Sequence, residues 1–206
     1  MTRRATATER RARAEARRAE RATVEDPEVV LEAAAAFLAV RPRSVDETRR
    51  RLRHLGYPTA PIEVVLDRLL AYGYLDDADF ARTWVESRDR ARPRGTHALR
   101  RELMLKGVDR EIIDAALDER GRDASPSEPA ADALVPRDAA HADDAAAQQL
   151  LARRAGALAR ESDPRKRRQK AYALLARNGF APDVCARWSA ALTAPSDDDP
   201  VLDEDV

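Results

Sequence analysis

The chain has 206 residues, as many acidic as basic side chains, 44% hydrophobic residues and only 4% aromatic ones. Small aliphatic side chains suit thin helical layers better than one thick core. A single cysteine excludes a disulfide framework, the longest apolar stretch is too short to span a bilayer, and no apolar signal core follows the N-terminal arginines. We therefore expect a soluble, cytoplasmic protein that makes no membrane contact.

Charge is segregated along the chain although its net value is zero. Residues 1–24 carry eight arginines against three glutamates, and residues 145–192 carry ten basic against three acidic side chains. Acidic groups gather at 122–144, with six acids against two bases, and at 197–205, with six acids and no base. Because 34 cations are arginine and only 3 are lysine, as a GC-rich genome would produce, arginine positions are more informative than arginine counts.

The first segment in chain order is a basic arm, residues 1–24. After Met1 it has no apolar side chain larger than alanine before Val24, so we expect it to be mobile or a solvated helix. A first packed helix is predicted from Pro27, where apolar residues recur at helical spacing. The residues expected to face inward are Val29, Val30, Ala33, Phe37 and Val40.

Two further helices complete repeat 1, which we place at residues 25–73. Ser44 and Glu47 have the spacing of a capping box, and the helix they open places Thr48, Leu52 and Leu55 inward before it ends at Gly56. A third helix begins near Pro61. Its expected inward residues are Ile62, Val65, Leu66 and Leu69.

Repeat 2 is predicted at residues 74–121, an acidic linker at 122–142, repeat 3 at 143–194, and an acidic disordered tail at 195–206. The apolar stripes of repeat 2 contain Phe80, Ala81, Trp84, Val85, Leu99, Leu103, Ile112, Ile113, Ala116 and Leu117. Those of repeat 3 contain Leu150, Leu151, Leu158, Tyr172, Leu175, Val184, Trp188 and Leu192. The fold class is therefore all-α, with nine helices in three units and no strand.

A shared period around Gly56, Gly107 and Gly179 supports three tandem repeats. The same kinds of residue precede and follow each glycine at fixed distances. Leucine stands four residues before it (Leu52, Leu103, Leu175), a large apolar residue follows it (Tyr57, Val108, Phe180), and Ile62, Ile113 or Cys185 lies six residues after it. Three-helix repeats of this kind form an elongated, curved array that binds partners along a surface rather than catalysing a reaction in a pocket.

Residues 73–117 carry the most specific motifs of the chain. They comprise GYLDDADFARTWVESR followed by PRGTHALRRELMLKGVDREIIDAAL. This stretch resembles the core of RecX, the bacterial regulatory protein of the RecA recombinase, and the resemblance extends from about Val29 to Leu192. The long basic arm, the acidic linker and the acidic tail depart from the family pattern and inherit no role from it.

The resemblance implies a regulator, not an enzyme, that binds RecA filaments on DNA and restrains their recombinase and ATPase activities. It would act without a cofactor, as a monomer, touching more than one RecA protomer and contacting DNA without sequence preference. Two alternatives stay open: a stand-alone DNA-binding protein of helix-turn-helix type, and a helical scaffold with no nucleic-acid role. Base readout favours polar readers beside arginine, which Arg49, Arg50 and Arg53 do not provide.

Candidate partner or DNA contacts are the basic residues at repeated positions. Arg100 and Arg101 occupy the offsets from Gly107 that Arg49 and Arg50 occupy from Gly56. In repeat 3 the charge lies earlier, in a run beside a helix N-terminus that could cradle phosphate. The full candidate set is Arg49, Arg50, Arg53, Arg94, Arg100, Arg101, Lys106, Arg165, Lys166, Arg167, Arg168 and Lys170. The competing interpretation is that these arginines are solvated faces of amphipathic helices.

No catalytic residue or metal site is expected. Asp76 and Asp77 fit helix N-capping, and the three histidines lack ligand spacing. Cys185 falls on an inward helical face and is expected to be an inert core thiol. Trp84 and Trp188 have core spacing, although an exposed indole edge could stack on a base.

Overall fold

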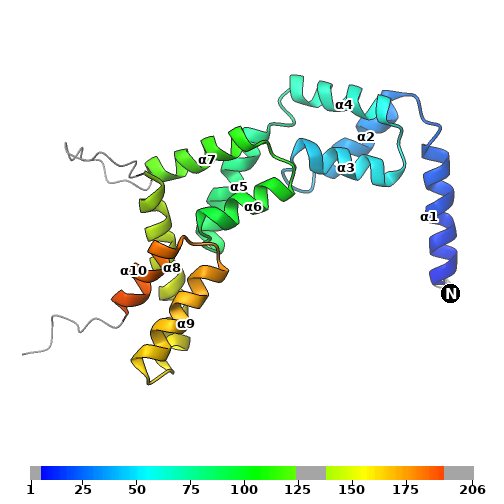
Figure 1. The fold of residues 1–206 in the computed structure, drawn as a ribbon. Coiled ribbons are helices and arrows are strands. Elements are labelled where there is room, and N and C mark those ends of the chain that lie inside the picture. The colour runs from blue at the N-terminus through cyan, green and yellow to red at the C-terminus, as the bar shows by residue number, and fades with distance from the viewer. Residues whose placement is uncertain (1–5, 124–137, 193–206) are drawn as a thin grey trace, which may run out of the picture. The chain divides into compact units, whose positions relative to one another are not determined.

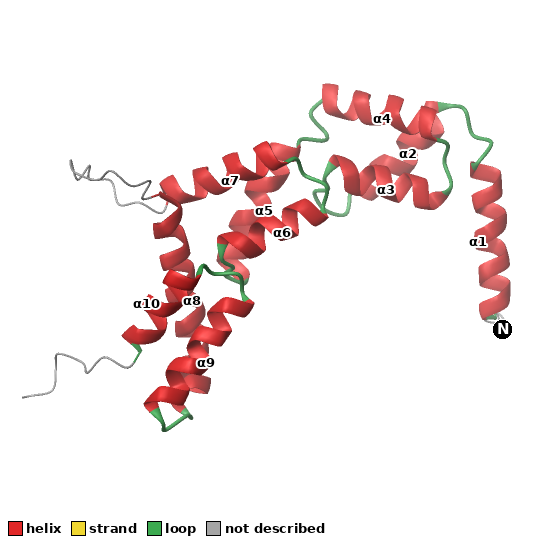
Figure 2. Cartoon of the chain, in the orientation of Figure 1, coloured by secondary structure: helices red, strands yellow, loops and turns green. Residues whose placement is uncertain are grey.

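The computed structural model describes residues 6–123 and 138–192, and over these residues it contains ten helices and no strand (Figures 1 and 2). The all-α prediction is confirmed. The helices are α1 (Ala7–Arg21), α2 (Pro27–Leu38), α3 (Val45–Leu55), α4 (Thr59–Ala71), α5 (Asp77–Ala91), α6 (Thr96–Leu105), α7 (Arg110–Asp123), α8 (Asp138–Ala159), α9 (Pro164–Arg177) and α10 (Pro182–Ala191). None of them combines the length and apolarity needed to cross a membrane.

The helix bounds refine the predicted divisions of the chain. Helix α7 continues to Asp123 and α8 begins at Asp138, so both ends of the predicted linker 122–142 are helical. The centre of that linker, residues 1–5 of the arm and the acidic tail 195–206 lie outside the described residues. The chain divides into two compact units, and the division passes through repeat 2: unit 1 is Met1–Ala81 with Leu103–Ile113, and unit 2 is Arg82–Glu102 with Asp114–Val206.

The core of unit 1 forms where α2, α3 and α4 pack against one another. Its buried residues are Val30, Ala34, Leu52, Tyr57, Ile62, Val65, Leu66, Leu69 and Leu75. The predicted inward face of α3 and α4 is confirmed, whereas Val29 and Val40 are exposed. Helix α2 ends at Leu38, before Val40, and its rotation places Ala34 in the core instead.

In unit 2, the helices α8, α9 and α10 enclose a second core. It consists of Ala146, Ala147, Leu150, Leu151, Leu158, Ala171, Leu175, Phe180, Val184 and Cys185, with Trp188 and Leu192 partly buried against it. Tyr172 was predicted to face inward but is exposed, because Ala171 and Leu175 form the buried stripe of α9. The buried alanines of α8 allow α9 and α10 to approach closely.

The three glycines of the shared period end α3, α6 and α9 in one way. Gly56, Gly107 and Gly179 have positive φ angles of 106°, 76° and 81°. In each case the N–H of the following residue donates to the carbonyl of the leucine four residues before the glycine, at 3.2 to 3.3 Å. This is the Schellman motif, which satisfies the last carbonyls of a helix. The nine aligned apolar residues are all buried, which confirms the predicted repeat.

Helix α1 is formed by the basic arm and is additional to the nine predicted helices. Thr6 and Glu9 make a reciprocal capping box at its start, and none of its residues is buried. Only its C-terminal end lies against the α2–α4 bundle (Figure 1). There the Arg21 guanidinium lies 5.6 Å from the ring centre of Tyr57, and Val24 packs on the core of unit 1. The arm is thus a solvated helix attached at one end.

Candidate partner interface

A joint within unit 1 connects the start of α3 to the end of α6. The Ser44 hydroxyl donates to the Lys106 carbonyl at 2.6 Å, and the Lys106 ammonium lies 2.9 Å from Glu47. The Val45 amide, first in α3, donates to the Asp77 carboxylate at 2.9 Å. Gly107 allows α3 to lie close to the end of α6, because a Cβ at position 107 would lie 2.5 Å from Cγ of Asp46.

A second joint, within unit 2, repeats this arrangement between the start of α6 and the end of α9. The Gly95 amide donates to the Asn178 carbonyl at 3.0 Å. Gly95 lies twelve residues before Gly107, as Ser44 lies twelve before Gly56. Asn178 directly precedes Gly179, as Lys106 directly precedes Gly107. The Thr96 amide, first in α6, donates to Asp143 at 3.1 Å, as Val45 does to Asp77. Each joint therefore pairs a helix start with the glycine end of the next repeat and an aspartate from that repeat.

Asp76 and Asp77 have different partners, so the prediction that both cap their own helix is half correct. Asp76 accepts from the amides of Ala78 and Asp79 at 2.8 and 3.0 Å, as an N-cap does. Asp77 instead caps α3 across the joint. Burial raises its pKa, which the hydrogen bond from Val45 only partly offsets.

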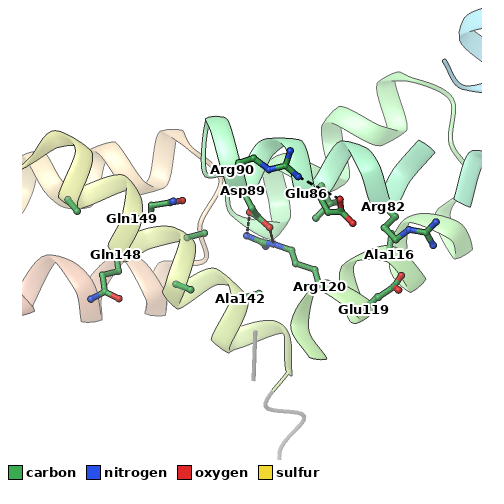
Figure 3. A pocket seen from close by; sticks show the side chains of 14 residues that line it. Arg82, Glu86, Asp89, Arg90, Ala116, Glu119, Arg120, Ala142, Gln148 and Gln149 are labelled. Atoms are coloured by element: carbon green, nitrogen blue, oxygen red, sulfur yellow. Dashed lines mark hydrogen bonds and ion pairs between the residues drawn. The ribbon is translucent and has the colours of Figure 1, made fainter. Parts of the chain in front are cut away.

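Arg120 is the buried cation of the second joint, and sequence reasoning did not single it out. Its side chain is 6% exposed and makes a bidentate pair with Asp89 at 2.8 Å (Figure 3). It also contacts Asp143 at 2.7 Å and donates to the Arg94 carbonyl. Burial tends to lower the pKa of Arg120, but the two aspartates outweigh it and the pKa is raised. Arg120 sits in a charged stretch, DERGRD, which gave no signal of burial.

A groove of about 810 Å³ lies beside this network, between α5, α7 and α8 (Figure 3). One wall is the alanine and glutamine face of α8, and the other carries Arg82, Glu86, Asp89 and Arg90 of α5. Its lining, which is made mainly of charged residues of both signs, alanines and glutamines, offers no convergent set of catalytic groups. Among the described residues, no cluster of histidine, cysteine, aspartate and glutamate could hold a metal ion.

The matching arginines of repeats 1 and 2 form matching ion pairs. Arg49 pairs with Glu63 at 3.0 Å, and Arg100 pairs with Asp114 at 2.8 Å. In both repeats the arginine lies seven residues before the glycine and the carboxylate seven residues after it. Hydrogen bonding to Glu63 raises the pKa of Arg49. The matching positions of Arg49 and Arg100 thus have a structural explanation. In each repeat the arginine forms an ion pair that links the last two helices, α3 with α4 and α6 with α7.

The remaining candidates of repeats 1 and 2 differ in how accessible their charges are. Lys106 and Arg94 both belong to joints: Lys106 contacts Glu47, and Arg94 donates to the Asn178 side chain at 2.9 Å. Arg50 and Arg53 are about half exposed, Arg50 bonding to Asp46 and to the Leu105 carbonyl, Arg53 approaching Glu63. Arg101 is exposed on α6.

The basic run of repeat 3, defined as Arg165, Lys166, Arg167, Arg168 and Lys170, lies on the first turns of α9. All are exposed except Arg167, which is half-buried and donates to the Glu161 carbonyl at 3.0 Å. Lys170 pairs with Glu161 and lowers the pKa of that carboxyl. Asp163 already accepts from the amides of Arg165 and Lys166, so an anion here would meet side chains rather than the helix-end amides.

The basic run replaces the residues that form the joints in repeats 1 and 2. The positions twelve and eleven residues before the glycine are Ser44 and Val45 in repeat 1, Gly95 and Thr96 in repeat 2, and Arg167 and Arg168 in repeat 3. Helix α9 also begins fifteen residues before its glycine, whereas α3 and α6 begin eleven before theirs, an extension of about one turn. In repeats 1 and 2 this helix start contacts the following repeat. In repeat 3 the same part of the helix is longer and carries cations.

Three further side chains are held inside the units. The Cys185 thiol is buried, and burial raises its pKa, consistent with a core thiol. Trp84 and Trp188 are half-buried, and their indole N–H groups donate to Glu102 at 3.0 Å and to Asp144 at 2.6 Å. The Arg88 guanidinium lies 4.1 Å from the Trp84 ring centre, so that face of the indole is covered.

Comparison with known proteins identifies all three repeats. Residues 31–69, 76–117 and 142–188 match the models of the first, second and third three-helix domains of RecX. Regulatory protein RecX of Mycobacterium avium is 42% identical over 99 residues, which cover 48% of this chain and 56% of the relative. That of Prosthecochloris aestuarii is 40% identical over 94 residues, covering 46% and 62%. The matched part therefore spans little more than half of these relatives' length.

Two solved structures share the fold. The crystal structure of RecX from Lactobacillus salivarius is 18% identical, with a TM-score of 0.60, and the match covers 82% of this chain and 97% of that one. A crystal structure of regulatory protein RecX is 20% identical, with a TM-score of 0.55 and coverages of 87% and 75%. At these identities the likeness concerns the fold alone.

Proposed function

Because the chain belongs to the RecX family of regulatory proteins, we propose that it binds RecA filaments on DNA and inhibits their recombinase and ATPase activities. It would do so by surface contact, without chemistry of its own and without a cofactor. Repeat proteins typically bind their partners along a surface rather than in a pocket, which suits a filament whose own protomers repeat. We further propose that it acts as a monomer in the cytoplasm.

We assign the contact with the filament to the basic run of α9. In repeats 1 and 2 the corresponding helix starts are occupied by the next repeat, through Asp77 and Asp143. In repeat 3 the helix start has cations in place of joint residues, and four of them, Arg165, Lys166, Arg168 and Lys170, are exposed. A position that receives a carboxylate in the other repeats would here receive an anionic group of the nucleoprotein filament.

The ion pairs of repeats 1 and 2 favour this assignment over a helix-turn-helix reader. Arg49 and Arg100, which such a reader would project towards bases, are already paired with Glu63 and Asp114. Either guanidinium could donate to a base edge only after its ion pair had been broken. DNA contact in the proposed function is consequently electrostatic and independent of sequence, through exposed arginines and lysines.

Charge reversal tests the proposal. The variant Arg165→Glu, Lys166→Glu, Arg168→Glu should lose inhibition of RecA-catalysed strand exchange while keeping its helical circular dichroism, because all three side chains are exposed. The matched control reverses three exposed arginines elsewhere in unit 2, Arg90, Arg92 and Arg122. Equal inhibition by wild type and the first variant would remove the basic run from the site. Equal loss in both variants would indicate a response to net charge only.

A further inference from the structure

The surface of α1 is strongly asymmetric in charge. At about 100° per residue, its six arginines fall within one half of the helix circumference. They are Arg10, Arg11, Arg13, Arg17, Arg18 and Arg21. The other half carries alanine, threonine and Glu15, and Glu9 and Glu20 lie at one edge of the basic half. A merely arginine-rich composition would not confine the arginines to one face.

Part of the basic face of α1 lies against repeat 1, and the rest remains open to solvent. Arg18 lies against Gly56, where a Cβ would come 2.8 Å from the Arg18 carbonyl oxygen, and Arg21 covers Tyr57. Gly56 thus receives α1 as Gly107 and Gly179 receive α3 and α6. Four arginines of the basic half remain, and all four are exposed. Arg11 is paired with Glu15, which leaves Arg10, Arg13 and Arg17.

These three residues, the arginine row, follow one another along the helix. Separations of three and four residues place Arg10, Arg13 and Arg17 over an axial length of about 10 Å, at 1.5 Å per residue. A nucleic-acid strand rises about 3.4 Å per nucleotide, so the row matches about three phosphates. Within the described residues, no carboxylate lies at ion-pair distance from the row, whereas Arg11 is paired with Glu15 at 3.0 Å.

We propose that α1 is a nucleic-acid-binding helix whose arginine row contacts the phosphate backbone, independently of RecA. A protein interface normally supplies buried aromatic or aliphatic anchors, and α1 has no apolar side chain larger than alanine. Guanidinium groups without large apolar neighbours suit phosphate, which they bind through paired hydrogen bonds. The matched family models begin at residue 31, so this site lies outside the repeats that define the family.

The test is binding of a fluorescein-labelled oligothymidylate by anisotropy, without RecA, at several salt concentrations. The variant Arg10→Gln, Arg13→Gln, Arg17→Gln should lower the slope of log K against log salt by about 2, since each lost contact to a single strand accounts for about 0.7. Glutamine has a helix propensity close to that of arginine, so α1 should persist in circular dichroism.

The control variant Arg90→Gln, Arg92→Gln, Arg122→Gln removes the same charge from exposed positions of unit 2 and should leave the slope within about 0.5 of wild type, less than one single-strand contact. An unchanged slope in the α1 variant, or an equal change in both variants, would overturn the proposal. So would a loss of binding to isolated RecA with unchanged DNA binding, because the row would then be a protein contact. Inhibition of strand exchange by the basic run of α9 does not enter this assay, so the two proposals fail separately.

Discussion

Replacing Gly179 by alanine should separate a joint while leaving the helices intact. Gly179 ends α9 with a φ of 81°, and a Cβ there would lie 2.5 Å from the Ala98 amide nitrogen and 2.9 Å from its Cα. Backbone atoms of α6 cannot yield as a flexible side chain would. Gly73 provides the matched control, since it has a φ of 71° and nothing within 4 Å of an added Cβ.

The expected loss of stability has two parts. A left-handed alanine costs about 1–2 kcal/mol at either glycine. At Gly179 the joint must also open, which breaks the bonds from Gly95 to the Asn178 carbonyl and from His97 to the Gly179 carbonyl. At about 1 kcal/mol for each hydrogen bond, Gly179→Ala should destabilise by about 2 kcal/mol more than Gly73→Ala.

Urea unfolding followed by circular dichroism measures this difference. The midpoint should fall further for Gly179→Ala than for Gly73→Ala, with unchanged slopes if both proteins unfold cooperatively. A broadened or biphasic transition in Gly179→Ala alone would also agree with an opened joint, because repeats that lose their neighbour unfold separately. Equal midpoints in the two variants would refute the idea that the glycine is a docking point as well as a helix end.

Three further outcomes follow from the buried groups. Arg120→Met should destabilise by about 3–5 kcal/mol in urea, because Asp89 and Asp143 lose their common cation; a loss below 1 kcal/mol would contradict the buried network. The raised pKa of Asp77 means that the folded chain binds its proton more tightly than the unfolded chain, so this group adds stability as pH falls from neutral towards its unfolded pKa. Asp77→Asn should remove this contribution to the pH dependence, which is measured as the difference between the urea midpoints at pH 7 and pH 4.5. The same difference in wild type and variant would contradict a raised pKa of Asp77. The buried Cys185 thiol should react with a thiol reagent only as the chain opens, whereas immediate reaction of the native protein would place it at the surface.

The periodic apolar residues were sufficient to predict the repeats because each repeat solves the same packing problem. Leu52, Leu103 and Leu175 are all fully buried, and the glycines that follow them have the left-handed conformation expected of a helix end. The inward assignment of Tyr172 failed because alanine at 171 is as compatible with burial as tyrosine, and the helix rotation was decided by its neighbours.

The charged contacts were only partly predictable. The offsets of Arg49 and Arg100 were visible in the sequence, and the carboxylates at the mirrored offsets, Glu63 and Asp114, could have identified them as intra-repeat pairs. Arg120 and Asp143 could not be paired in advance, because 23 residues separate them and only the fold brings them together. The docking of α1 at Gly56 was likewise hidden, since the helix end alone accounts for the glycine.

The most direct test of the proposed function is ATP hydrolysis by RecA on single-stranded DNA. Wild-type protein should suppress the steady-state rate in a concentration-dependent manner, and the variant Arg165→Glu, Lys166→Glu, Arg168→Glu should restore it towards the rate of RecA alone. An unchanged RecA rate at saturating wild-type protein would contradict the proposal that this chain inhibits the filament.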